Sequence, residues 1–187
     1  ATQQLILDTG AEAVTSAAEL VATAHRTVLN PANPLVTMNL LQSSHHAGKS
    51  LKATLLSNPD LLVINAHKLT KSLGEELSEF QAALDALQVS PLPGQYREVV
   101  SSHLKEADSK VKDKINDVVT SALGADKPST DNATKDTVLA LEDYKNATKE
   151  VATIMSDKNI QKKIIDAAHE VLSRSGDMFL EAQNVLK

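Results

Sequence analysis

The sequence predicts an all-α protein: an up-down antiparallel bundle of five to six long amphipathic helices. Aromatic residues make up only 2% of the 187 residues, so the core must be built from Ala, Leu, Val and Ile, which suits closely packed helices better than a sheet. Six Gly and six Pro are too few for a turn-rich β protein. Every segment between short helix-breaking stretches shows helical periodicity, which also indicates helices.

Five breakers divide the chain, and each combines Pro, Gly or a capping Ser, Asn or Asp. The six segments between them are roughly 25–30 residues long and carry helical periodicity. Short connections between long helices predict antiparallel neighbours. The breakers lie at 30–34, 57–60, 90–94, 124–131 and 156–159.

Two of the segments show the periodicity most clearly, with apolar residues recurring at steps of three and four. In the third segment these are Leu62, Ala66, Leu69, Leu73, Leu77, Phe80, Leu84 and Leu87. In the fourth they are Val100, Leu104, Ala107, Val111, Ile115 and Val118. No breaker has the length or composition of a flexible linker, so we predict one domain over residues 1–187, with 124–131 as the best alternative boundary.

Composition excludes several classes of function. A net charge of −5 and a pI near 5.7 provide no basic field for nucleic acid. The absence of cysteine excludes a disulfide framework and a thiolate metal site. No apolar run approaches the roughly 18–20 residues that a membrane span needs. We therefore expect no nucleic-acid partner and no transmembrane segment.

No motif points to catalysis. The histidines show no i, i+4 pair that would place two rings on one metal, and no nucleophile motif or phosphate-binding glycine loop occurs. Glu75, Glu76 and Glu79 are expected on a solvated face, and the five positive and five negative charges of the fourth segment are expected to pair with each other. We expect no enzyme, no catalytic residue, no metal and no cofactor. The histidines are His25, His45, His46, His67, His103 and His169.

The last segment carries the best candidate for partner binding, over residues 164–182. Wound at 100° per residue, it gathers its apolar and small side chains on one face, with charged residues opposite. Such a face must be buried against something, either the rest of the chain or a second protein. The candidate residues are Ile164, Ala167, Ala168, Val171, Leu172, Ser175, Met178, Phe179 and Ala182.

The first segment follows the same template over residues 6–24. A large aliphatic residue is followed by small residues three and four positions on, by apolar pairs at seven and eight and at fourteen and fifteen, and by an alanine at eighteen. Thr9-Gly10 replaces the small pair, and Gly costs about 1 kcal/mol of helix propensity relative to Ala, so this helix is the weaker candidate. Its residues are Ile6, Ala13, Val14, Ala17, Leu20, Val21 and Ala24.

This template resembles the vinculin-binding helices of the talin rod. "SDKN" (156–159) before the last helix, "VLNPANP" (28–34) and "LPGQ" (92–95) resemble the links between talin rod helices. The resemblance implies a non-enzymatic, cytoplasmic module of an adaptor that links adhesion receptors to actin. It further implies a bundle that tension opens, exposing a cryptic helix to vinculin, with actin as a second possible partner. Vinculin and α-catenin share this fold style.

Two alternatives remain at the level of sequence. In one, every apolar face is simply core. In the other, the chain is a secreted amphipathic bundle that binds lipid or apolar surfaces. Ala1, the absence of cysteine and the N-glycosylation motifs at Asn132 and Asn146 favour this second alternative slightly.

Overall fold

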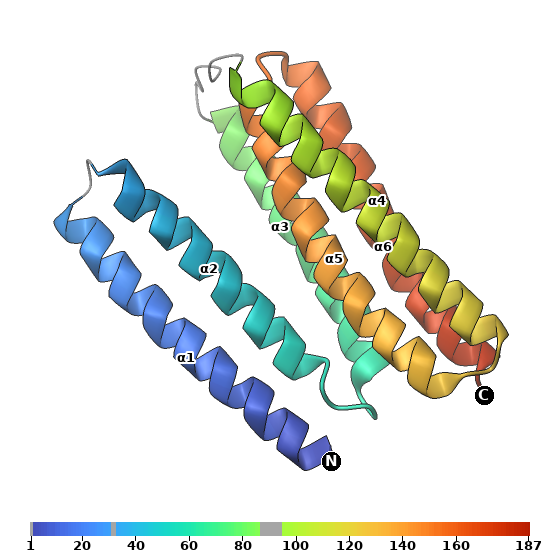
Figure 1. The fold of residues 1–187 in the computed structure, drawn as a ribbon. Helices are drawn as coiled ribbons and strands as arrows, with labels where there is room; N and C mark the ends of the chain where they lie inside the picture. The colour runs from blue at the N-terminus through green and yellow to red at the C-terminus, as the bar shows by residue number, and fades with distance from the viewer. Residues whose placement is uncertain (1, 31–32, 87–94) are drawn as a thin grey trace. The chain divides into compact units, whose positions relative to one another are not determined.

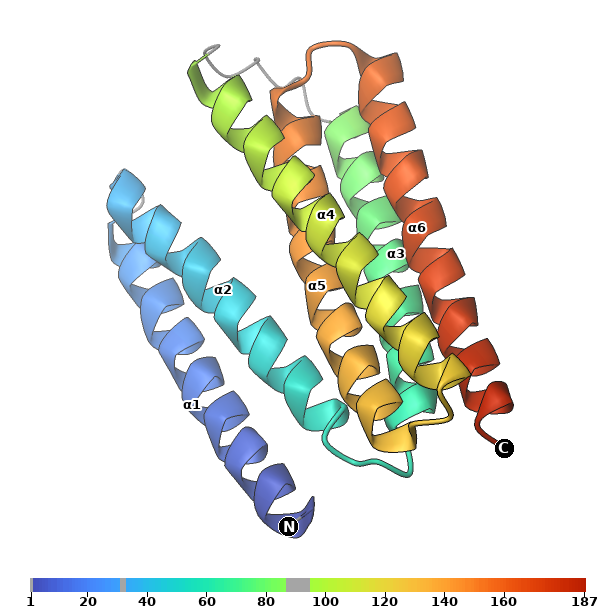
Figure 2. The ribbon, with the colours of Figure 1, turned by 45° about the vertical axis from the view of Figure 1, so that its right-hand side comes forward.

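A computed structural model describes residues 2–30, 33–86 and 95–187, and in these ranges it contains six helices and no strand (Figures 1 and 2). The all-α prediction is confirmed. The breaker at 90–94 lies outside the described residues. The helices are α1 (Thr2–Leu29), α2 (Pro34–Leu55), α3 (Leu62–Ala86), α4 (Gln95–Leu123), α5 (Lys127–Ile154) and α6 (Lys158–Val185).

The chain divides into two compact units. Residues 1–62 hold α1 and α2, and residues 63–187 hold α4, α5, α6 and all of α3 except its first residue. The segment 124–131 lies inside the second unit, where it joins α4 to α5. A single domain over residues 1–187 stays a prediction.

Side-chain caps begin three of the helices at the breakers. Asn33 accepts a hydrogen bond from the backbone N–H of Leu35 at the start of α2, and Asp157 accepts one from Asn159 at the start of α6. Asp126 caps α5 by accepting hydrogen bonds from the backbone N–H and the hydroxyl of Ser129. These bonds lower the pKa of Asp126, so their contribution to stability is present at neutral pH and is lost as the pH falls through that pKa.

Pairs of hydroxyl groups meet across the contact between α1 and α2. Ser16 Oγ lies 3.1 Å from Ser50 Oγ, and both residues are buried. One heptad further along α1, Thr23 Oγ1 lies 3.2 Å from Ser43 Oγ. The Ser16 and Thr23 hydroxyls also donate to carbonyls of their own helix, so both buried hydroxyl groups have hydrogen-bond partners.

The predicted apolar face of α1 is only partly buried in the first unit. Val14 and Val21 are 72% and 70% exposed, and Ala17 is exposed as well. The other predicted face residues, Ile6, Ala13, Leu20 and Ala24, are half-buried. Ser16 and Thr23, which contact α2, each follow a half-buried residue of this face, Ala13 or Leu20, by three positions, so the buried side of α1 is the predicted face rotated away from Val14 and Val21.

The second unit has an aliphatic core that follows the predicted periodicity. Ala66, Leu73, Leu77 and Leu84 of α3 are buried, and Leu87 lies outside the described residues. In α4 the predicted positions are likewise buried or half-buried. These are Val100, Leu104, Ala107, Val111, Ile115 and Val118. At one end of this core, Val100 packs with Val151 and Ile154 of α5.

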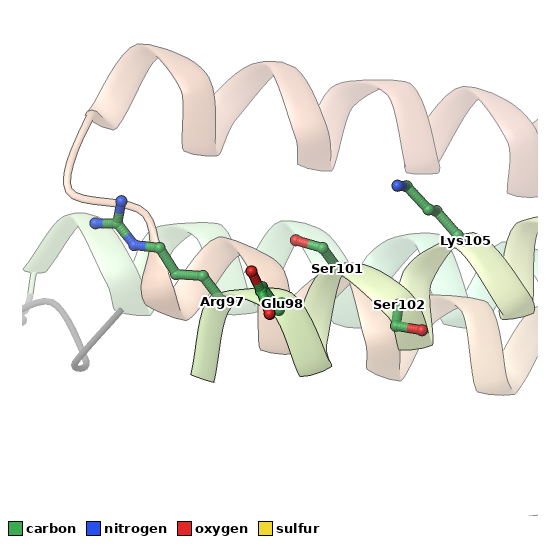
Figure 3. A pocket seen from close by; sticks show the side chains of 5 residues that line it. All are labelled: Arg97, Glu98, Ser101, Ser102 and Lys105. Atoms are coloured by element: carbon green, nitrogen blue, oxygen red, sulfur yellow. The ribbon is translucent and has the colours of Figure 1, made fainter. Parts of the chain in front are cut away.

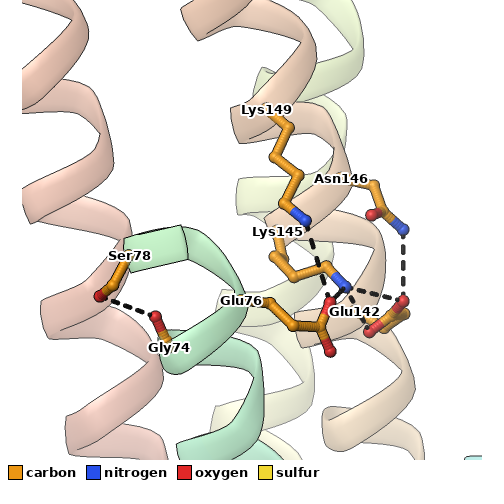
Figure 4. Close-up of polar contacts among 7 residues, drawn as sticks. All are labelled: Gly74, Glu76, Ser78, Glu142, Lys145, Asn146 and Lys149. Carbon is orange, nitrogen blue, oxygen red and sulfur yellow. Dashed lines mark hydrogen bonds and ion pairs between the residues drawn. The ribbon is translucent and has the colours of Figure 1, made fainter. Parts of the chain in front are cut away.

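A buried charge network joins α3 to α5 within this core (Figure 4). The Lys145 ammonium of α5 donates to a carboxylate oxygen of Glu76 and to both oxygens of Glu142 at 3.1 and 3.2 Å. The side chains of Lys145 and Glu142 are only 4% and 5% exposed. The Lys149 ammonium lies 3.9 Å from Glu76 and above the ring of Phe80. The expectation of a solvated face is therefore wrong for Glu76, which is half-buried and ion-paired, although Glu75 and Glu79 are exposed.

We predict that Lys145→Ala lowers the free energy of unfolding by about 3–5 kcal/mol, because it leaves the Glu142 carboxylate buried without its cation. Lys127→Ala is the control, since Lys127 is a lysine of the same helix whose exposed ion pair with Asp131 is worth less than about 1 kcal/mol. Urea unfolding followed by circular dichroism measures both changes. Equal effects of the two substitutions would contradict the structural role assigned to the network.

We also predict that a fragment of residues 60–187, which holds the whole second unit, unfolds alone in one cooperative thermal transition. The reason is that the buried residues of α3 to α6 form a core within the second unit. Circular dichroism and differential scanning calorimetry should give coincident midpoints. A broad, non-cooperative melt of this fragment would show that its core depends on residues 1–59.

Candidate functional site

Helix α6 is the candidate partner-binding element, and its buried residues form one continuous seam. They recur at alternating steps of four and three along the helix, which keeps them on one face. Leu172 and Phe179 at the centre of the seam are among the largest fully buried side chains. The seam consists of Gln161, Ile165, Ala168, Leu172, Ser175, Phe179 and Ala182, with Gly176 buried beside it.

The structure distributes the predicted binding residues over three environments. Ala168, Leu172, Ser175, Phe179 and Ala182 are buried; Ile164, Val171 and Met178 are half-buried; and Ala167 is exposed. The expected face is therefore the face that packs on the bundle, rotated slightly so that Ile165 is buried and Ala167 is not.

Sequence reasoning missed Ile165, Gln161 and Gly176. Ile165 continues the regular steps of four and three, so counting these steps back from Phe179 would have found it. Gln161 and Gly176 offer no such signal, because a polar residue and a glycine do not mark a core position in a sequence.

The polar links between α6 and the other helices all lie in its first turn. Gln161 Nε2 donates to the carbonyls of Ala152 and Met155 at 2.9 and 2.8 Å, which satisfies backbone groups at the end of α5. The Lys158 ammonium donates to the carbonyl of Leu84 in α3. Beyond Gln161, no hydrogen bond joins α6 to another helix among the described residues, and burial of apolar side chains holds the helix.

At its N-terminal end α6 joins the cluster formed by α4 and α5. Ile164 packs against the buried Val100, Val151 and Ile154, together with Leu104 and Met155. The first residue of the predicted binding face is thus part of the packing between three helices of the second unit.

The α4 surface carries charges without a catalytic arrangement. A shallow cavity of about 340 Å³ is lined by Arg97, Glu98, Ser101, Ser102 and Lys105 along the first turns of α4 (Figure 3). Further along, Lys112 pairs with Asp108 of the same helix, as the balanced charges of this segment predict, whereas Lys110 pairs with Asp143 of α5. Among the residues that the structure describes, no group of three or more His, Asp or Glu side chains could hold a metal ion.

The helices of the second unit thus form a helical-bundle module without a metal centre among the described residues. The family model of the Talin IBS2B domain matches residues 60–187, and the chain belongs to that family. The talin rod is a family of structural adaptors found at the cytoskeleton and at adhesion sites. No solved structure matches the chain significantly.

Membership of this family does not support the alternative of a secreted lipid-binding bundle. The threonines of both glycosylation motifs, Thr134 and Thr148, are buried in α5, and Asn146 is half-buried beside Glu142. Within the described ranges, no helix has an apolar stretch that could cross a membrane.

Proposed function

We propose that this chain is a rod module of a talin-like adaptor in which α6 is a cryptic binding helix for vinculin. The proposal rests on one face of α6, which is buried in the folded bundle and also matches the binding face of a vinculin-binding helix. The residues that match a vinculin-binding helix include Leu172 and Phe179, which are fully buried in the folded bundle. A partner that takes this helix into a groove has to bury the same atoms.

The folded bundle and a helix-binding partner therefore compete for α6. Opening a domain of ordinary stability costs about 5 kcal/mol or more. Each 1.4 kcal/mol is a factor of ten in affinity, so the intact domain should bind at least about a thousandfold more weakly than free α6. Tension that separates the helices would remove this penalty, which makes the module a mechanosensitive switch.

Helix α1 is a second, weaker vinculin-type helix in this proposal. Unlike that of α6, its binding face is partly exposed in the folded unit. Val14, Ala17 and Val21 are exposed in the folded protein, so α1 would offer part of its face without opening. The first unit would then add a low-affinity contact that does not respond to force. Val14→Glu removes this contact from an exposed position and isolates the behaviour of α6.

The wider role that we propose is a cytoplasmic link between adhesion receptors and the cytoskeleton. The family implies integrin or cytoskeletal partners, and direct binding of actin is part of the proposal. Single-domain behaviour of residues 1–187 is also proposed, with both units transmitting tension along the rod.

The test uses Ala167, which lies on the predicted binding face and is exposed in the folded domain. We predict that Ala167→Glu weakens binding of the vinculin head to a peptide of residues 158–187 at least about a hundredfold, because the charge must be buried in the groove. Ser173→Glu adds the same charge at an exposed position on the polar face and should change the affinity by less than about threefold.

Calorimetry on each peptide, and on the full chain carrying Val14→Glu, separates the outcomes. Tight binding by the unmodified peptide with weak binding by the chain supports the cryptic site. A peptide that does not bind, or that loses as much affinity from Ser173→Glu as from Ala167→Glu, would leave the α6 seam as plain core.

A further inference from the structure

Two glycines face two histidines where α3 and α6 pack against each other. A Cβ added at Gly176 of α6 would lie 2.7 Å from Thr70 Oγ1 and 3.3 Å from His67 Nδ1 of α3. A Cβ added at Gly74 of α3 would lie 3.1 Å from His169 Nε2 of α6. These five residues, His67, Thr70, Gly74, His169 and Gly176, form what we call the α3–α6 crossing.

The crossing is reciprocal. Each helix presents a histidine and, seven residues later, a glycine, so that both groups lie on the same side two turns apart. Neither glycine has a positive φ, so the backbone conformation does not require glycine at these positions. Since Gly is a poor helix former, the contact distances give the physical reason for both residues: they make room for side chains of the opposite helix.

At the α3–α6 crossing, no hydrogen bond joins α6 to α3 among the described residues. Thr70 Oγ1 donates to carbonyls of its own helix, at 3.1 Å for Ala66 and 2.9 Å for His67, and not to α6. His67 Nδ1 is buried and has no hydrogen-bond partner among the described residues. A cavity of about 280 Å³ lies between the helices here, lined also by the charged Lys71, Glu75 and Asp177.

We propose that the α3–α6 crossing is the latch that sets how readily α6 leaves the bundle. This inference rests on the proposed function of α6, which it extends to regulation. Contact between a glycine and a bulky side chain depends steeply on the distance between the helices, so a small separation removes most of the attraction. The cavity beside the contact, which charged side chains line in part, then accepts water that solvates the unpartnered His67 nitrogen as the helices part.

Gly176→Ala in the full chain tests the latch, with Val14→Glu present to remove the α1 contact. Added side-chain volume at the crossing must push α6 from α3, although alanine is the better helix former. We expect amide hydrogen exchange of α6 to accelerate at least tenfold relative to α4 and α5, and vinculin-head affinity to rise by a similar factor. Gly10→Ala is the control for the hydrogen-exchange measurement, because it makes the same replacement outside the crossing and nothing lies within 4 Å of a Cβ at that helical position.

A second substitution makes the result specific to the crossing. Thr70→Ala removes the hydroxyl that lies 2.7 Å from the added Cβ and leaves the Thr70 Cβ at 3.7 Å, an ordinary contact. In the Gly176→Ala, Thr70→Ala double variant only the His67 ring, 3.3 Å from the added Cβ, has to shift slightly, so this variant should restore most of the slow exchange and weak binding. Since Thr70 is outside α6, this rescue does not alter the helix that the partner takes.

Hydrogen exchange and vinculin binding distinguish failure of the latch from failure of the proposed function. Faster exchange of α6 that Thr70→Ala reverses, without vinculin binding, would support the latch and overturn the vinculin proposal. Exchange of α6 that stays unchanged, as in Gly10→Ala, or that rises equally in α4 and α5, would overturn the latch.

Discussion

Helix α6 has a single apolar face, and the rest of the structure depends on where that face is buried. In the folded protein it packs on the bundle, with Leu172 and Phe179 at its centre. Any partner that recognises a helix through the same face must wait until the bundle opens. Folding stability and partner affinity are therefore linked quantities, because whatever stabilises the closed bundle weakens apparent binding by the same free energy.

The helices of the second unit differ in the polar contacts that join each of them to its neighbours. The network of Glu76, Glu142 and Lys145 joins α3 to α5, and Thr137 donates to the Lys114 carbonyl across the contact between α5 and α4. Beyond its first turn, α6 has no such link among the described residues, and at its contact with α3 it has glycines and a cavity. Directional polar contacts fix the register of three helices, whereas mostly non-directional burial retains the fourth. In the function proposed above, this difference would let α6 leave without every contact in the bundle being broken.

Much of this architecture could be predicted from the sequence, because helix breakers and apolar periodicity are local signals. The caps at Asn33, Asp126 and Asp157 and the apolar stripes of α3 and α4 lie where the pattern places them. The interior of the first unit could not be predicted in this way, since buried Ser16 and Thr23 look like surface residues until the partner helix is known. The ion pair of Glu76 and the close contact at Gly176 could not be predicted for the same reason. A buried ion pair and a close helix contact are set by residues that are distant in sequence.

The most direct test of the central claim is stretching of single full-length chains carrying Val14→Glu, held at constant force with the vinculin head in solution. We expect the head to bind only after an extension step that opens the bundle, and we expect the bound chain not to refold when the force is lowered. Binding to the chain at zero force, as tight as binding to the free peptide of residues 158–187, would contradict the claim that folding and partner binding compete for one face of α6.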